Sequence, residues 1–144
     1  MNLADVRWID IAHSDDDRGT LTAIEDAALP FRIRRVFYMH RVPHGRERGA
    51  HAHRYTQQAA VALTGSFTID VSDGTESQTY VLDDPNRCLY LPAMTWTHLR
   101  GFDPATVALV LCDTLYHPEH VVRDWHEYVR LRHEGALAAA SPRP

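Results

Sequence analysis

Short strand-like runs, each bounded by turn-forming residues, recur along most of this chain of 144 residues. The runs are rich in β-branched, aromatic and aliphatic residues and lie at 6–11, 20–24, 33–39, 59–63, 66–71, 78–82, 87–91 and 106–112. Clusters such as Asp73-Gly74 and Asp83-Asp84-Pro85 stand between them and favour turns. Strands this short, at this regular spacing, predict an all-β sandwich or barrel.

The last quarter of the chain changes its period. From His120 onward, apolar residues recur at helical spacing, among them Val121, Trp125, Tyr128 and Val129. We therefore expect one C-terminal helix packed on the barrel. Residues 135–144 are rich in Ala, Ser and Pro, so we expect a flexible tail after a single domain over residues 1–134.

Charge and hydropathy exclude several classes of partner. A formal net charge of −4 leaves no overall basic field, so nucleic acid is not an expected partner. No apolar segment has the length that crosses a bilayer and no secretory signal is present, so we expect a cytoplasmic protein without a membrane partner. Cys88 and Cys112 lie far apart in apolar runs, which indicates reduced core thiols.

Two histidines stand in the motif Gly45-x5-His51-x-His53-x4-Gln58-x6-Gly65. If residues 50–55 are extended, His51 and His53 share one face, roughly 6.6 Å apart along the strand. Two imidazoles on one wall suit proton transfer or metal ligation, and the simpler alternative is a hydrogen-bonded pair without chemistry.

This spacing resembles the first motif of the cupins, in which the position of Gln58 usually holds Glu. A glutamine supplies no negative charge to offset a cation. The later segment from Leu91 to His98 lacks the glycine of the second cupin motif, and its histidine is displaced by one position, which points a strand side chain to the other face. We therefore expect no metal and no other cofactor.

Further segments resemble the sugar 3,4-ketoisomerases of the WxcM-like cupin family, over most of residues 5–130. These segments include Asp17-Arg18-Gly19, Arg35-Val36-Phe37-Tyr38, Tyr116 and Arg123-Asp124. The resemblance implies a cupin-type jelly-roll barrel that moves the carbonyl of dTDP-4-keto-6-deoxyglucose from carbon 4 to carbon 3, in deoxysugar and aminosugar biosynthesis. It also implies a homodimer with exchanged N-terminal strands, for which residues 6–11 are the natural candidate.

A keto shift needs a base that removes a proton beside the carbonyl and returns it to the neighbouring carbon. We expect His51 to be this base and His53 to orient it or to relay the hydroxyl proton. Tyr38 matches the position of the family's active-site tyrosine and is expected to pass a proton between the two oxygens of the enediol. A buried structural tyrosine is the alternative for that residue.

Candidate substrate-binding residues are Arg18, Arg41, Arg48, Gln58 and His98. A guanidinium forms a fixed fork of donors for anionic oxygen or pyrophosphate, whereas His98 is assigned to the sugar end of the pocket by resemblance. Arg18 follows three aspartates, so a solvated turn with local ion pairs is its alternative. Gln58 is alternatively a structural amide bonded to His53.

Three other functions stay open at this point. A metal-dependent cupin oxygenase would use His51, His53 and His98 as ligands. A nucleotide-sugar epimerase begins with the same proton removal, and a sugar-binding module would leave its ligand unchanged. For the isomerase, family likeness favours an axial hydroxyl at carbon 4 of the product.

Overall fold

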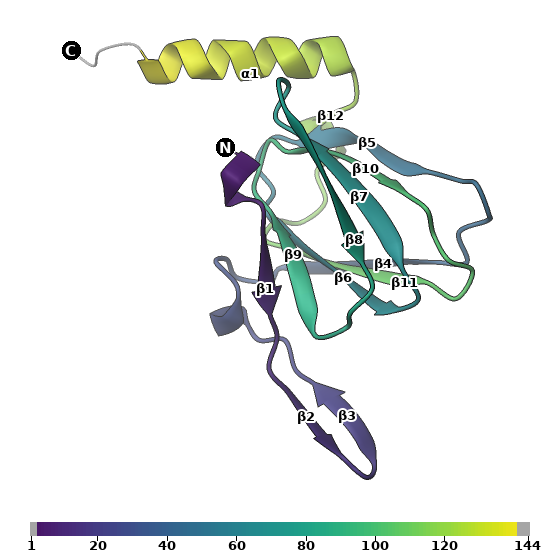
Figure 1. Ribbon diagram of the computed structural model, residues 1–144. Coiled ribbons are helices and arrows are strands. Elements are labelled where there is room, and N and C mark those ends of the chain that lie inside the picture. The colour runs from purple at the N-terminus through teal and green to yellow at the C-terminus, as the bar shows by residue number, and fades with distance from the viewer. Residues whose placement is uncertain (1–2, 141–144) are drawn as a thin grey trace.

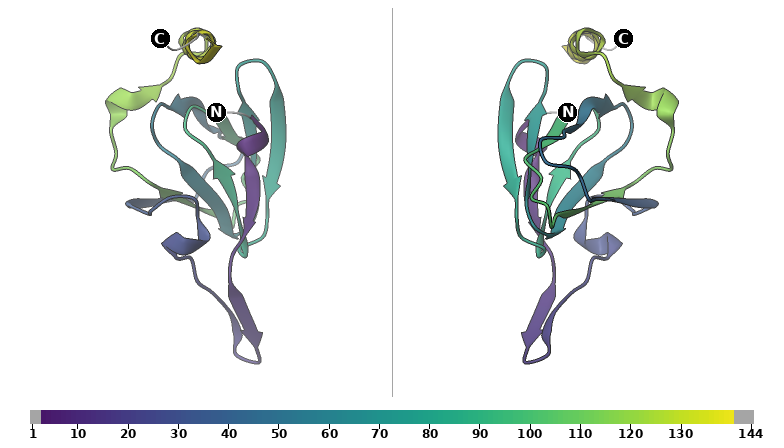
Figure 2. Two further views of the ribbon diagram at one scale, coloured as in Figure 1. Left: turned by 90° about the vertical axis from the view of Figure 1, so that its left-hand side faces the viewer. Right: turned by 90° about the vertical axis from the view of Figure 1, so that its right-hand side faces the viewer.

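Two five-stranded antiparallel sheets face each other in the computed structural model, which describes residues 3–140 (Figures 1 and 2). The first sheet has the order β1-β9-β6-β11-β4 and the second β12-β5-β10-β7-β8. One C-terminal helix lies across the end of this sandwich (Figure 1). The predicted all-β fold with a single C-terminal helix is therefore confirmed.

The first sheet contains β1 (Arg7–Asp10), β9 (Arg87–Leu91), β6 (Gln58–Thr64), β11 (Val107–Cys112) and β4 (Arg35–His40). The second contains β12 (Val121–Val122), β5 (Arg48–His53), β10 (Trp96–Arg100), β7 (Phe67–Ser72) and β8 (Ser77–Leu82). A separate hairpin is formed by β2 (His13–Asp16) and β3 (Gly19–Thr22). The helices are η1 (Leu3–Asp5), η2 (Asp26–Ala28), η3 (Pro118–His120) and α1 (Trp125–Ala140).

The main core lies between the two sheets. On β7, Phe67, Ile69 and Val71 are buried there, as the alternation in residues 66–71 predicts. A second apolar cluster covers the outer side of the first sheet, where Leu29 and Phe31 pack near Val61 and Leu111. Strands of the first sheet therefore carry apolar residues on both faces.

The helix begins later and ends later than the sequence predicts. Its N-cap is Asp124, whose Oδ1 accepts a hydrogen bond from the backbone N–H of Glu127 at 2.8 Å. Val121 and Val122, which were expected to be helical, instead form β12 and pair with β5. At the other end α1 continues past residue 135 to Ala140, because alanine has the highest helix propensity. Residues 141–144 of the expected tail lie outside the described residues.

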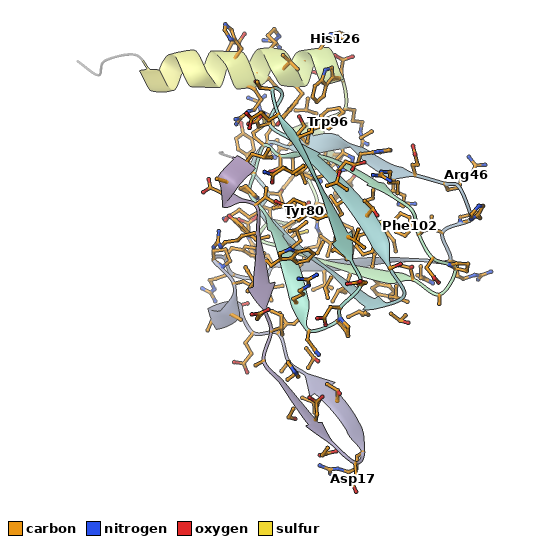
Figure 3. The ribbon with its side chains drawn as sticks, in the orientation of Figure 1. Asp17, Arg46, Tyr80, Trp96, Phe102 and His126 are labelled. Carbon is orange, nitrogen blue, oxygen red and sulfur yellow. The ribbon has the colours of Figure 1, made fainter. Side chains whose placement is uncertain are left out.

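Helix α1 is attached to the second sheet through Tyr128. This side chain is fully buried beside Trp96 and Trp125, and its hydroxyl lies 2.8 Å from the carbonyl oxygen of Met94 and 3.0 Å from that of Ser72. Figure 3 shows Trp96 on the barrel directly beneath the helix. Among the described residues, no helix is long and apolar enough to span a membrane.

The β2–β3 hairpin projects beyond the barrel, with Asp17 at its tip (Figures 1 and 3). It forms a two-stranded sheet of its own, and nearly all of its side chains are exposed, including Leu21. In contrast, β1 pairs with β9 of the same chain. Residues 7–10 thus complete the first sheet of this chain, whereas the hairpin lies outside both sheets.

Candidate active site

A cavity of about 620 Å³ opens between the two sheets, and a smaller inner part of about 120 Å³ continues towards the core. The two parts share the lining residues Phe37, Arg48, Gly49, His51 and His53. The opening is large enough for a small organic ligand. The histidine pair predicted from the sequence therefore lies in the wall of the main cavity.

The two imidazoles contact each other directly. Nε2 of His51 lies 3.2 Å from Nε2 of His53, and the ring planes are nearly perpendicular, at 87°. At this distance one ring donates a hydrogen bond and the other accepts it. Nδ1 of His51 is buried and has no hydrogen-bond partner among the described residues. Because Nδ1 is shielded from the cavity, Nε2, which contacts His53, is the nitrogen through which His51 can exchange a proton.

A bulge in β5 lies directly before these side chains. In the pairing with β10, His51 is opposite Thr97 and Gly49 is opposite His98, so Ala50 has no partner residue. Ala50 and Gly49 both have positive φ, of 57° and 87°. A Cβ on Gly49 would lie 2.9 Å from the carbonyl oxygen of Thr97, so only glycine fits this position.

Both imidazoles are neutral at neutral pH. Burial lowers the pKa of each ring, and the pKa of His53 falls to about 4. The positive charge of Arg123 lowers both pKa values further, while the backbone of Gly49 partly opposes the shift at His51. Each ring therefore has a lone pair available to accept a proton, which an imidazolium lacks.

Three guanidinium groups face the same cavity, from Arg35 on β4, Arg48 on β5 and Arg123 after β12. No ion pair with a carboxylate joins any of these three among the described residues, in contrast to arginines such as Arg18 and Arg100. Unpaired positive charge around a cavity favours an anionic ligand. The cavity is therefore suited to a ligand that carries phosphate or a developing oxyanion.

Arg35, Tyr116 and Arg123 were not chosen as site residues from the sequence. The guanidinium of Arg35 lies over the ring of Tyr116 at 5.2 Å, and its Nη2 is 3.6 Å from Sγ of Cys112. The available signal was their presence in the segments that resemble the ketoisomerases. The sequence did not predict that they lie together in one cavity, because β4, the segment before η3 and the segment after β12 are far apart in the chain and meet only in the folded structure.

Two of the expected binding residues do lie in the cavity. Arg48 lines both parts, and Gln58 lines the inner part from β6. The side-chain amide of Gln58 lies 3.7 Å from Sγ of Cys112. Its amide is therefore directed to the Cys112 thiol, whereas a bond to His53 had been the structural alternative.

Tyr38, Arg41 and His98 lie outside the cavity. On β4 the alternate residues Phe37 and Met39 face inward, so Tyr38 points outward and is 61% exposed. Arg41 lines a separate surface groove beside Tyr38. On β10, Thr97 and Leu99 face the inner part of the cavity, and His98 points to the other side, where its Nε2 is 2.9 Å from Oε2 of Glu47. The expected positions of these three side chains in the chain's own cavity are therefore wrong.

Arg18 is also remote from the cavity of its own chain. It follows Asp17, which Figure 3 shows at the tip of the projecting hairpin, and its Nη2 is 2.7 Å from Oδ2 of Asp16. This is the solvated turn with a local ion pair that the sequence offered as the alternative. Any contact of Arg18 with a ligand would have to be made in a second molecule.

The three-histidine metal site of an oxygenase does not form in this arrangement. His98 is turned away from His51 and His53, and Gln58 supplies an amide in place of a carboxylate. The described residues contain one cluster of three or more potential metal ligands, and it lies elsewhere, at His117, Glu119 and His120. The histidine pair is thus better suited to proton transfer than to holding an ion.

A family model with the description "FdtA: WxcM-like, C-terminal" matches residues 4–133. This match covers most of the chain and agrees with the resemblance seen in its motifs. The chain belongs to the WxcM-like family.

Several known proteins resemble this chain over most of its length. The TDP-4-oxo-6-deoxy-alpha-D-glucose-3,4-oxoisomerase of Aneurinibacillus thermoaerophilus is 33% identical over 114 residues, which cover 78% of this chain and 82% of the relative. The crystal structure of the sugar 3,4-ketoisomerase QdtA from Thermoanaerobacterium thermosaccharolyticum in complex with TDP has a TM-score of 0.90 and 30% identity, covering 93% of this chain and 98% of QdtA. The H51N mutant of QdtA in complex with TDP-4-keto-6-deoxyglucose has a TM-score of 0.89 and 29% identity, covering 92% and 97% of the two chains.

Proposed function

We propose that this WxcM-like protein is a sugar-nucleotide 3,4-ketoisomerase that acts on dTDP-4-keto-6-deoxyglucose. The observation that carries the proposal is the buried, neutral pair of His51 and His53 in a cavity edged by unpaired arginines. The relatives named above act on or bind ligands of this class. The neutral pair supplies the base and the arginines supply the complementary charge.

The proposed isomerisation consists of two proton transfers, one between the carbons and one between the oxygens. Nε2 of His51 removes the proton from carbon 3, the C3–H electron pair forms the C3–C4 double bond, and the carbonyl oxygen at carbon 4 becomes an enediolate oxygen. The proton is then returned to carbon 4, while the proton of the carbon-3 hydroxyl passes to the oxygen at carbon 4, so that carbon 3 gains the carbonyl and carbon 4 the hydroxyl. Donors that stabilise the enediolate lower the barrier for both steps, and no redox cofactor takes part.

His53 has the position to relay the second proton. It lies in direct contact with His51 and in the wall of both parts of the cavity. The role expected for Tyr38, passing the proton between the two oxygens, is assigned here to His53, since Tyr38 points out of the cavity. Arg35, Arg48 and Arg123 are proposed to hold the enediolate and the pyrophosphate.

Deuterium exchange followed by NMR tests the proposal. Wild-type protein incubated with dTDP-4-keto-6-deoxyglucose in deuterated water is expected to produce the 3-keto sugar. His51→Asn is expected to lower the rate by at least about a hundredfold, the usual range for loss of a general base. His126→Asn, an exposed histidine on α1 (Figure 3), is the matched control and should keep the wild-type rate.

Each alternative function gives its own NMR result. Binding without any new keto sugar would indicate a sugar-binding module, and deuterium incorporation with inversion but no carbonyl migration would indicate an epimerase. Unchanged turnover in His51→Asn would show that another residue is the base. By family likeness, we propose that the hydroxyl formed at carbon 4 is axial.

We also propose a homodimer in which the β2–β3 hairpin of each chain packs on the other. An isolated hairpin of two four-residue strands with exposed side chains is only marginally stable in water. Packing on a second chain would stabilise it in its projecting position. Packing of this kind would bring Arg18 close to the cavity of the partner chain. A cytoplasmic location is proposed as well, since Cys88 and Cys112 are both free thiols.

A further inference from the structure

A cluster of metal-ligating side chains lies at η3 and its N-cap, outside the cavity. His117, Glu119 and His120 each offer one ligand atom, and these atoms all lie within 4.8 Å of one another. Nδ1 of His117 is 3.3 Å from Oε1 of Glu119. We propose that this cluster is a binding site for a divalent transition-metal ion of the zinc type. The site is independent of the proposed isomerase function, which assigns no role to these three residues.

The backbone holds the two histidines on one side of η3. A 3-10 helix has three residues per turn, so positions 117 and 120 lie one above the other. Pro118 restricts the backbone between them, and the N–H of His120 donates to the carbonyl oxygen of His117 at 3.0 Å. The two ring centroids are 5.2 Å apart. The spacing of the ligands is thus set by a closed backbone turn.

One ligand of the cluster is anchored to the barrel. The carbonyl oxygen of His120 accepts a hydrogen bond from the N–H of Arg54 at 3.0 Å, and its ring meets the ring of Tyr55 edge to face at 4.9 Å. His117 and Glu119 are exposed and have room to rotate. A fixed histidine with two adjustable neighbours allows the ligand atoms to close around an ion with little strain.

The donor set selects the class of metal. Two imidazoles and one carboxylate suit zinc and similar borderline ions, whereas magnesium and calcium prefer sites made of oxygen ligands only. In a tetrahedral zinc site with bonds of about 2.0–2.1 Å, neighbouring ligand atoms are about 3.3 Å apart. The separation of His117 and Glu119 already has this value, at 3.3 Å. The fourth position would hold water.

The position of the cluster links it to the wall of the cavity. Tyr116 and Val121, which flank it in the chain, line the cavity, and Val121 pairs with His53 in the sheet. An ion held by His117, Glu119 and His120 would order this segment while leaving the nitrogens of His51 and His53 untouched. Those two histidines are the competing zinc ligands that an experiment has to separate.

Isothermal titration with zinc chloride tests the site in the full chain. We expect one zinc ion per chain for the wild type and no binding heat with magnesium chloride. Loss of a residue that only hydrogen-bonds to a metal ligand typically lowers metal affinity about 10–100-fold. Because His117 and Glu119 are proposed to bind the ion directly, His117→Ala and Glu119→Gln should each weaken zinc binding by at least about tenfold. Both residues are exposed, so these variants should fold normally.

Two control variants separate the competing sites. His126→Ala removes an exposed histidine elsewhere, and the double variant His51→Asn/His53→Asn removes the pair in the cavity; both should bind zinc as the wild type does. Absence of zinc binding in the wild type would overturn the proposal. So would binding that survives His117→Ala but is lost in the cavity double variant, or binding of magnesium with equal affinity.

Discussion

At the scale of single residues, the chemistry depends on two imidazoles that burial keeps uncharged. Solvent around an exposed histidine stabilises the imidazolium, and the wall of the cavity removes much of that solvent from His51 and His53. The surrounding guanidinium groups act in the same direction, because they repel a further positive charge. The arrangement that favours an anionic ligand therefore also keeps the base in its reactive form.

This depressed pKa predicts a loss of stability in acid. The unfolded chain binds a proton at His53 near its ordinary pKa of 6.5, whereas the folded chain binds it only near pKa 4. Stability is fully present above 6.5 and falls as the pH is lowered towards 4, because the unfolded state then binds more protons; the loss is on the order of 3 kcal/mol. Urea unfolding of wild type at several pH values between these limits measures it.

His53→Asn and His126→Asn show whether this residue is the source. In His53→Asn, the part of the pH dependence that comes from this ring should disappear, while His126→Asn should retain the wild-type slope. An identical slope in wild type and His53→Asn would contradict the assignment of the shift to burial of His53.

At the scale of elements, the bulge in β5 decides that Arg48 faces the same cavity as the two histidines. A regular strand would keep Arg48, Ala50 and Ala52 on one face and Gly49, His51 and His53 on the other. The unpaired Ala50 interrupts the ladder, and Arg48 lines the cavity together with Gly49, His51 and His53. The bulge thus adds a guanidinium to the wall that carries the base.

Substitution of Gly49 tests the importance of this bulge. Gly49→Ala places a Cβ 2.9 Å from the Thr97 carbonyl oxygen at a φ of 87°, so we expect a loss of stability of about 1–3 kcal/mol and reduced isomerase activity. Gly45→Ala is the matched control, because Gly45 has a similar φ of 77° with nothing within 4 Å of the added Cβ. Chemical denaturation compares the two; equal losses would mean that the close contact in β5 is unimportant.

At the scale of the whole molecule, the projecting hairpin stands apart from both sheets of its own chain (Figure 1). Every other strand belongs to one of the two packed sheets, while β2 and β3 pair only with each other. In the proposed dimer, the hairpin would be covered by the partner chain. Arg18 would then lie near the cavity of the partner chain, because it is remote from the cavity of its own chain. Crossed heterodimers distinguish this arrangement from a dimer with self-contained sites.

Arg18→Ala and His51→Asn are placed in separate chains of one heterodimer, isolated with two different tags. If each hairpin serves the partner's cavity, one of the two sites is intact and about half of the wild-type activity remains. The reciprocal heterodimer joins a wild-type chain to an Arg18→Ala/His51→Asn chain and should be nearly inactive. The reverse pattern would show that Arg18 acts in its own chain, and full activity of the Arg18→Ala homodimer would exclude a role for Arg18.

The sequence alone determined the class of fold, the family and the central pair of His51 and His53. These features depend on local spacing, such as the alternation of strand residues and the separation of the two histidines within one strand. Local spacing of this kind can be identified directly in the sequence. It also predicted Arg48 and Gln58 as members of the site, since both lie on the strands that carry or adjoin the motif.

The other side chains that reach the cavity could not be identified without the three-dimensional arrangement of the strands. Tyr38 and His98 share strands with cavity residues but point to the opposite faces, while Arg35 and Arg123 come from separate elements and meet beside the histidines. A side chain in a strand points to one of two faces, and a shift of one residue or a single bulge reverses the choice. Which face a side chain points to depends on pairing with strands that are far away in the chain. Local spacing in the sequence therefore does not predict it.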